Sequence, residues 1–399
     1  MKKTKNAFRS LQHGRIHQSR NAVITKKNPV NAKKKAEELM RLRLSVDMNP
    51  LYRNVLTWSY TKTGDFPVDG DRKFSTVGNT FSSAAEYQAT FEPLLLLECW
   101  QGIQRAKQIG ENTPFKISIG SRAATDSFFD VYASVKKEIV NEMRLVNDND
   151  LVALILTATL PDGDKLTQRH IQNPKASCFA KVREIKTNAG GFADITLRVA
   201  TSTPLISCLS PGCVLACIRV SQMTTIEREY SSLKGLQYYD LFENIISAHP
   251  TPPETLDHTR VEEMKRLYDV NSSQATAIAG TVHNKGFSLI QGPPGTGKTK
   301  TILGIIGYVL TNVSLDGAQP IVQPGQKTAS TESKRKILIC APSNAAVDEL
   351  VLRLMGGIKD SKGQIFKPRV VRLGRSDAIN AQVKKTTLEE LVDAKITIR

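Results

Sequence analysis

The sequence has no apolar run long enough to cross a bilayer, since Leu94 to Leu97 provides only one turn of a buried helix. Its six cysteines include no C-x-x-C pair, and the spacing of Cys208, Cys213 and Cys217 suits no common zinc site. We therefore interpret the cysteines as reduced structural thiols, consistent with a nuclear or cytosolic protein. No internal repeat is evident either.

Acidic residues are absent before Glu37. Residues 1–48 carry 13 Lys and Arg against 3 Asp and Glu, in a chain of net charge +17. This excess of positive charge, with few apolar residues, predicts a basic disordered arm. The arm could bind nucleic acid or direct nuclear import, act as a mitochondrial presequence, or serve as a linker. The lysine cluster at 33–35 and the weak amphipathicity disfavour the presequence, and we favour a linker with incidental affinity for nucleic acid.

Residues 292–299 match the phosphate-binding pattern G-x-x-x-x-G-K-[ST] at every position. Glycines let the backbone N–H groups point at a phosphate, the lysine reaches the β- and γ-oxygens, and the threonine hydroxyl ligates Mg²⁺. A short apolar run at 287–290 precedes the loop, and apolar residues at helical spacing follow it, so a helix N-terminus faces the anion. The predicted nucleotide-binding residues are Gly292, Pro293, Pro294, Gly295, Thr296, Gly297, Lys298 and Thr299, with Lys298 and Thr299 catalytic and Thr299 the Mg²⁺ ligand.

AAA+ ring ATPases use the same loop sequence, but they also need an acid at the end of a buried strand beside the magnesium. The predicted strand at 336–341 ends at Pro342, because proline cannot donate to a ladder. Asp348 and Glu349 follow inside a helical pattern that stops at Gly356. We therefore expect these two carboxylates to be solvated rather than metal-bound, which disfavours the ring-ATPase interpretation.

The segment 341–350, Ala-Pro-Ser-Asn-Ala-Ala-Val-Asp-Glu-Leu, resembles the second helicase motif of senataxin-type superfamily 1 helicases and of the related nonsense-decay helicases. The resemblance implies that Pro342, Ser343 and Asn344 grip single-stranded nucleic acid. A plain helix N-cap is the alternative role for the serine and asparagine, and both roles are compatible. The segment 271–278 resembles the family's Q motif, which implies that Gln274 recognises the adenine edge and selects ATP.

Further stretches at 91–101, 222–230 and 371–376 are similar to the same family, and the matches run from about residue 50 to the C-terminus. The resemblance implies a nuclear, ATP- and Mg²⁺-dependent helicase that moves 5′→3′ on single-stranded RNA or DNA. It also implies removal of RNA from RNA–DNA hybrids, contact with the transcription machinery, and a role in transcription termination and RNA processing.

The predicted fold class is α/β: an incomplete RecA-like P-loop lobe preceded by a small β-barrel carried on a two-helix stalk. Strands are predicted at 115–119, 151–158, 180–185, 195–199 and 214–220, and helices at 91–108 and 225–248. A parallel sheet is predicted from 287–290, 336–341 and 369–373, interrupted by a flexible insertion at 311–335. The predicted domains are the arm at 1–48, a packing segment and first stalk helix at 49–110, the barrel at 111–222, the second stalk helix at 223–249, and the ATP-binding lobe at 250–399.

Past Leu350 no hydrophobic strand ends in Asp-Glu, so the family's magnesium-binding and water-positioning acids have no counterpart in the sequence. The second lobe, which in the family supplies arginines at the γ-phosphate worth roughly 10³–10⁵ in rate, has none either. The expectation is a lobe truncated before its second acidic motif, which binds ATP weakly through Lys298 without turnover. The alternative function is a non-catalytic fragment that binds single-stranded nucleic acid.

Overall fold

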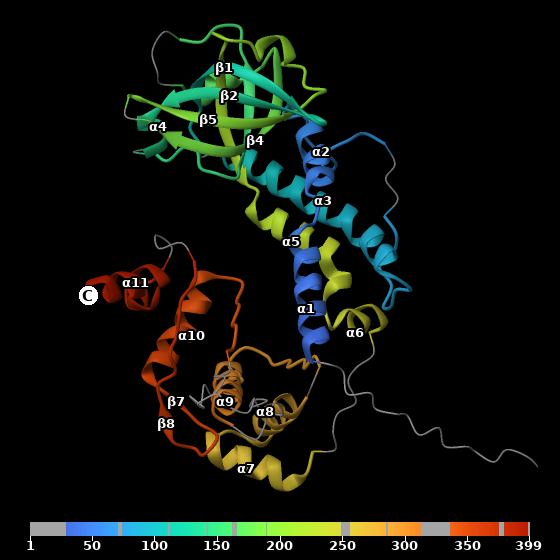
Figure 1. Ribbon diagram of the computed structural model, residues 1–399, viewed down its shortest axis with the longest axis vertical. Coiled ribbons are helices and arrows are strands. Elements are labelled where there is room, and N and C mark those ends of the chain that lie inside the picture. The colour runs from blue at the N-terminus through green and yellow to red at the C-terminus, as the bar shows by residue number, and fades with distance from the viewer. Residues whose placement is uncertain are drawn as a thin grey trace, which may run out of the picture. The chain divides into compact units, whose positions relative to one another are not determined.

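The computed structural model describes residues 29–70, 74–110, 112–141, 143–161, 166–188, 190–248, 256–284, 286–312, 336–374 and 379–397. These residues fall into two compact units, 1–247 and 248–399. The first contains six strands and the helices packed against them, and the second contains the P-loop (Figure 1). Residues 1–28 of the predicted arm, most of the 311–335 insertion, and Arg375 and Ser376 lie outside the described residues.

Six antiparallel strands of the first unit close into a barrel in the order β1-β2-β5-β4-β3-β6. The barrel is irregular, because register shifts interrupt the β1–β2, β3–β6 and β4–β5 pairings. Burial alternates along several strands, so one set of side chains fills the interior, as a half-buried strand requires. The bounds are β1 Phe115–Thr125, β2 Phe128–Lys136, β3 Asp150–Leu156, β4 Ala176–Thr187, β5 Phe192–Ala200 and β6 Val214–Gln222. The five predicted strands are present, and β2 was missed.

Helices α2 (Asn49–Thr57), α3 (Ala84–Ile109) and α5 (Thr224–Gly235) share one apolar cluster with the barrel. Trp100 is fully buried in this cluster and meets Trp58 edge to face, with ring centroids 5.6 Å apart. Polar contacts join the same elements: the Tyr52 hydroxyl donates to Glu227 Oε1 at 2.9 Å, and Lys181 pairs with that carboxylate at 3.0 Å. Apolar burial therefore anchors all three helices to the barrel, and the shared carboxylate also joins α2 and α5 to β4.

Two helix predictions in this unit were wrong. Residues 29–44 form helix α1 (Pro29–Leu44) rather than a disordered arm, because the segment is rich in Ala, Lys, Glu, Leu and Arg, all good helix formers. The helix predicted at 225–248 is broken into α5, a 3₁₀ turn η3 (Leu236–Tyr238) and α6 (Phe242–Ser247). Gly235, a poor helix former, is the last residue of α5. Short elements complete the unit: α4 (Lys137–Asn141), η1 (Gln168–Ile171) and η2 (Ile206–Cys208).

The second unit is mainly helical among its described residues. Helices α7 (His258–Tyr268), α8 (Ser272–His283) and α9 (Lys298–Thr311) share one apolar cluster. Helix α10 (Asn344–Gly356) packs on α9 through a second cluster that contains Ile306, Leu354 and Ile358. The strands β7 (Ile358–Lys359) and β8 (Ile365–Phe366), the turn η6 (Lys384–Thr386) and helix α11 (Leu388–Thr397) follow.

The predicted parallel sheet was wrong for the described residues. Segments 287–290 and 336–341 run without ladder partners, and 369–373 contributes only an isolated bridge from Arg372 to Thr387. Ile337 and Ile339 nevertheless contact the α9–α10 cluster, while Leu338 between them is 81% exposed and Leu289 is 97% exposed. Segments 336–341 and 369–373 therefore have the alternating burial of strands, whereas residues 287–290 are all exposed, and the described residues supply no neighbouring strand to pair with any of the three.

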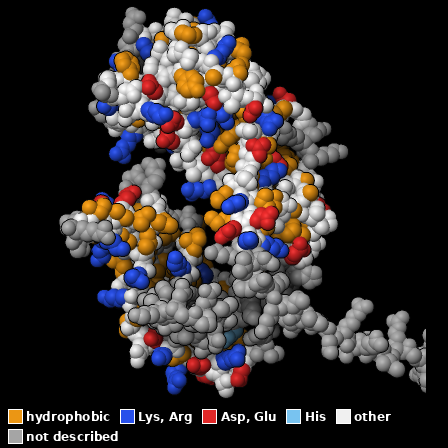
Figure 2. Space-filling model, in the orientation of Figure 1, with side chains coloured by type: hydrophobic (Ala, Val, Ile, Leu, Met, Phe, Trp, Pro, Cys, Tyr) orange, Lys and Arg blue, Asp and Glu red, His pale blue; other side chains and the backbone are white. Residues whose placement is uncertain are grey.

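Hydrophobic side chains gather on the surface of the second unit around α10 and α11 (Figure 2). On α11, Leu388, Val392 and Ile396 are exposed at four-residue spacing, so one apolar face of this helix is uncovered by described residues. Among the helices that the structure describes, none combines the length and apolar character needed to cross a membrane.

Candidate functional site

The P-loop lies directly before α9, and the side chain of its lysine folds back onto carbonyl groups of the loop. Lys298 Nζ donates to the carbonyl oxygens of Gly292 and Pro293, both at 2.8 Å. The Thr296 hydroxyl also donates to the Pro293 carbonyl at 2.8 Å. An ammonium group has only donors, so phosphate oxygens could replace these carbonyls as its acceptors. The loop thus positions the Lys298 charge where a bound phosphate would need it.

The start of α9 fits an anion. Gly297 is the N-cap and has a left-handed backbone with φ +79°, which glycine adopts without steric cost. No side chain caps this helix start, so the N–H groups of its first turn keep no intrahelical acceptor. Thr299 in this turn is half-buried. Unsatisfied amides, the helix dipole and a lysine suit the phosphates of a nucleotide, and the threonine hydroxyl oxygen suits its Mg²⁺.

Gln274 connects α8 to the P-loop. Its Nε2 donates to the Thr296 carbonyl at 2.8 Å, and its Oε1 accepts from the Asn271 amide at 3.1 Å in a capping box at the start of α8. The amide group predicted to recognise adenine is therefore engaged at both ends. Contact with an adenine edge requires Gln274 to release at least one of these partners.

Close packing against β7 fixes the position of α9. A Cβ at Gly307 would overlap the backbone carbonyl of Lys359 at the end of β7. Thr311, one turn further along, accepts a hydrogen bond from the Ser361 amide at 2.7 Å. The absence of a side chain at Gly307 lets β7 approach the helix axis, so this glycine fixes the helix that carries Lys298.

Ser343 and Asn344 are both exposed at the start of α10. Ser343 is the N-cap, and its hydroxyl accepts from the Ala346 amide at 3.2 Å. The N-cap role, predicted as one of two compatible roles, is thus present for Ser343. Asn344 instead accepts a hydrogen bond from Arg372 Nη2 at 2.9 Å on its side-chain oxygen. Pro342 precedes the cap and is exposed as well.

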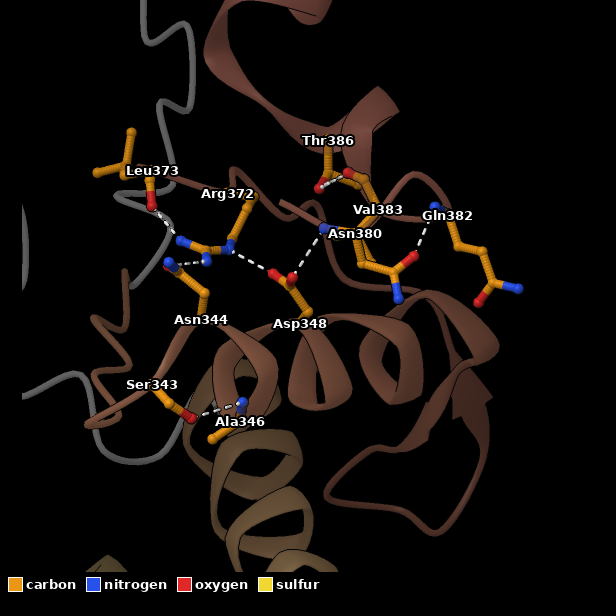
Figure 3. A network of polar contacts seen from close by, with 10 residues as sticks. All are labelled: Ser343, Asn344, Ala346, Asp348, Arg372, Leu373, Asn380, Gln382, Val383 and Thr386. Atoms are coloured by element: carbon orange, nitrogen blue, oxygen red, sulfur yellow. Dashed lines mark hydrogen bonds and ion pairs between the residues drawn. The ribbon is translucent and has the colours of Figure 1, made fainter. Parts of the chain in front are cut away.

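Asp348 was predicted to be solvated, and this prediction was wrong. The residue is 4% exposed and accepts from Arg372 Nε at 2.8 Å and from the Asn380 amide at 2.9 Å (Figure 3). Burial alone would raise the pKa of this carboxyl group, but the Asn380 amide and the Arg372 guanidinium outweigh burial and hold the pKa below its ordinary value of 3.8. A charged carboxylate is buried here because it is fully paired.

Glu349 is solvated as predicted, whereas Asp348 is not, and neither lies in a cluster of possible metal ligands among the described residues. Asp348 is committed to Arg372 and Asn380, and Glu349 pairs with Arg353 one turn along α10 at 2.7 Å. No group of three or more His, Cys, Asp or Glu side chains that could hold a metal ion occurs within the described ranges. Thr299 therefore remains the one predicted Mg²⁺ ligand, and the P-loop, rather than a carboxylate cluster, provides the fit to a magnesium–nucleotide complex.

The sequence did not single out Arg372 for the site. This residue is 5% exposed and contacts both Asp348 and Asn344 from 24 and 28 positions away. Two signals were present: the arginine lies inside an otherwise extended segment, 369–373, and inside the stretch 371–376 that is similar to the helicase family. Its pairing is non-local, so no local pattern revealed it.

The P-loop, the helix behind it and a β-barrel within the same chain define the class as a P-loop nucleotide-binding protein with a barrel domain. Residues 110–220 match the family model "Helicase SEN1 beta-barrel domain", and residues 269–399 match the model "AAA domain". The description "AAA domain" names a P-loop ATPase class, while the relatives that match the chain are named as helicases.

The chain is 45% identical to "Helicase SEN1" of Saccharomyces cerevisiae and 33% identical to "Helicase sen1" of Schizosaccharomyces pombe, each over 94% of this chain. It is 26% identical to "Probable helicase senataxin" of Mus musculus over 86% of this chain. The aligned parts make up 17%, 21% and 14% of these relatives. The chain belongs to the senataxin-type superfamily 1 helicase family and matches a small part of its longer members.

Proposed function

We propose that this chain contributes the ATP-binding and single-strand-gripping part of a helicase. The observation that carries the proposal is the P-loop at the uncapped start of α9, where Lys298 occupies loop carbonyls that a phosphate can replace. We assign Lys298 and Thr299 to the phosphates and Mg²⁺, and Gln274 to the choice of adenine. A bound magnesium–nucleotide complex would supply the cleavable phosphoanhydride; the protein residues bind and orient it.

The nucleic-acid part of the proposal rests on Pro342, Ser343 and Asn344. All three are exposed at a helix start, where amides and small polar groups suit a sugar-phosphate backbone. Single-stranded RNA or DNA, action on RNA–DNA hybrids, 5′→3′ movement, contact with the transcription machinery and a nuclear role in transcription termination and RNA processing are proposed from family membership. The RecA-type lobe is proposed likewise. It is supported by the order of elements along the chain, in which a helix is followed by an extended segment, the P-loop and a second helix.

The pair formed by α3 and α5 is proposed as the stalk that carries the barrel. Lys234 on α5 pairs with Glu92 on α3 at 2.6 Å, and the Tyr230 hydroxyl donates to the same carboxylate at 3.3 Å. Two helices joined by apolar contacts and a shared ion pair can act as one rigid element. The predicted boundaries of the packing segment, barrel and lobe are part of this proposal. The disordered arm over 1–48 and the continuous second stalk helix over 223–249 are not, because α1 and the break after α5 contradict them.

A polypeptide of these 399 residues is proposed to bind ATP without turning it over. Asp348 is buried and engaged by Arg372 and Asn380, so it is not free to assist the magnesium or the attacking water, and Glu349 lies on the exposed side of α10 in an ion pair with Arg353. This engagement also favours the second candidate function, a non-catalytic binder of single-stranded nucleic acid. Both candidate functions predict an affinity for nucleic acid that falls steeply as the salt concentration rises.

The test measures three quantities on the purified polypeptide: MgATP binding, phosphate release, and binding of a labelled single-stranded oligonucleotide with and without MgATP. Binding of ATP and oligonucleotide without phosphate release is the expected result. Turnover that disappears in Lys298→Ala would overturn the non-catalytic part of the proposal. Failure to bind ATP would leave only the second candidate, and failure to bind either ligand would overturn both.

A further inference from the structure

One buried ion pair lies directly behind the predicted strand-gripping residues. Asp348 is one helical turn after Asn344 on α10, so the two side chains share a face of the helix. Arg372 reaches both: its Nε donates to Asp348 Oδ1 at 2.8 Å and its Nη2 donates to Asn344 Oδ1 at 2.9 Å (Figure 3). Arg372 and Asp348 are 5% and 4% exposed, whereas Asn344 is exposed.

The chemistry of arginine fixes which way the Asn344 amide group points. A guanidinium group has only donors, so the asparagine atom beside it must be the carbonyl oxygen. The amide nitrogen, with its two donors, is therefore turned away from Arg372. An exposed N–H₂ group at a helix start can donate to phosphate, sugar or base oxygens of a nucleic acid strand.

Arg372 is itself held in place from several directions. The Asp348 carboxylate binds its side chain, and its backbone amide donates to the Thr386 carbonyl at 2.8 Å beside the bridge to Thr387. The second oxygen of Asp348 accepts from the Asn380 amide at 2.9 Å. Val383, between these contacts in sequence, is fully buried. The guanidinium therefore has one defined orientation, and this orientation reaches Asn344.

We infer that Arg372 and Asp348 are positioning residues of the single-strand site: Asp348 orients Arg372, and Arg372 presents the Asn344 amide as a donor to the strand. This inference rests on the proposed function and adds to it the segments 369–374 and 379–387, which have no nucleic-acid role in that proposal. Arg372 acts through Asn344 and needs no contact with the strand of its own.

The test is a double-mutant cycle read by fluorescence anisotropy with a fluorescein-labelled 20-nucleotide oligouridylate. Arg372→Lys keeps the charge but loses the planar fork, and Asn344→Ala removes the donor. Each single change is expected to weaken binding about tenfold. The double variant is expected to bind no worse than Asn344→Ala, because Arg372 then has nothing left to orient. The matched control, Arg353→Lys, alters an exposed ion pair of the same helix and should leave affinity unchanged.

A second variant keeps the inference testable if Arg372→Lys does not fold. Asn344→Asp retains an oxygen for Arg372 but loses the N–H₂ donors, so the melting temperature should hold while affinity falls at least tenfold. Additive losses in the cycle, or unchanged affinity in Asn344→Asp, would overturn the inference while the proposed function stands. Absence of oligonucleotide binding by the unaltered chain would instead overturn the single-strand site itself, and the inference with it.

Discussion

Gln274 Nε2 lies 2.8 Å from the carbonyl oxygen of Thr296, so the side chain of one helix holds the P-loop of the next. The same amide group completes the capping box of α8 through Asn271. A residue proposed to select adenine is thus also a structural support of the phosphate loop. Nucleotide binding and loop order are therefore coupled at this position.

Gln274→Ala is expected to weaken ATP binding about tenfold and to remove most of the preference for ATP over GTP, because the adenine-edge partner is lost. The measurement is competition of ATP and GTP against a fluorescent ATP analogue. Ser273→Ala, an exposed neighbour in the same helix turn, is the matched control. An ATP preference that survives in Gln274→Ala would show that another residue recognises the base.

Gly297→Ala is expected to lower the stability of the second unit by about 1–2 kcal/mol and to abolish ATP binding. Gly297 has φ +79°, which strains an alanine, and an added Cβ would overlap the Gln274 amide nitrogen. Gln274→Ala in the same chain should restore part of the stability, since it removes the overlap but not the backbone strain. Equal unfolding midpoints for the single and double variants would contradict this packing.

The buried carboxylate of Asp348 makes the stability of the second unit depend on pH in the acid range. Its pKa in the folded state lies below the ordinary value of 3.8, so its contribution is complete above about pH 4 and is lost as the pH falls through the folded pKa. Asp348→Asn should cost about 3–5 kcal/mol at pH 7, because Arg372 then lacks its charged partner.

Denaturant unfolding of the unaltered chain and Asp348→Asn, followed by circular dichroism from pH 7 to pH 3, measures this effect. The difference in unfolding free energy between the two proteins should narrow as the pH falls below about 4, because the unfolded chain then binds a proton at Asp348 that the folded chain, with its lowered pKa, does not yet bind. A constant difference in unfolding free energy over the whole pH range would show that the charge of Asp348 contributes nothing to stability.

Leu51→Ala is expected to destabilise the first unit by about 2–5 kcal/mol. Leu51 is fully buried where α2 joins the cluster shared by the barrel and α3. Both tryptophans of the chain, Trp58 and Trp100, lie in this cluster, so tryptophan fluorescence follows the unfolding of this unit alone. Thr57→Ala, on the exposed side of α2, is the control; an equal effect of both changes would mean that α2 is not anchored by Leu51.

Local patterns predicted the parts of the fold whose causes are local. The loop spacing at 292–299 and the apolar period after it gave the P-loop and α9, and the Ser343 N-cap follows from a polar residue before a helical pattern. The strand β2 was missed although Phe128, Val131, Ala133 and Val135 are buried within a run rich in β-forming residues. That composition was a usable signal.

The remaining differences depend on partners distant in sequence. Asp348 follows Val347 on α10 and was read as a solvated helix residue; its burial depends on Arg372, 24 residues later. The apolar run at 336–341 has strand alternation, but pairing requires neighbours that no local window specifies. A sequence gives the preference of a segment, and tertiary contacts decide whether the preferred ladder forms.

The central claim is that Lys298 belongs to a working nucleotide site. Isothermal titration of MgATP into the 399-residue polypeptide tests it, with Lys298→Ala against Lys300→Ala, whose ammonium group instead lies near Asp269 outside the loop. Saturable binding that is lost by at least tenfold in Lys298→Ala and kept in Lys300→Ala is the predicted result. Equal binding by all three proteins, or no binding by the unaltered one, would contradict it.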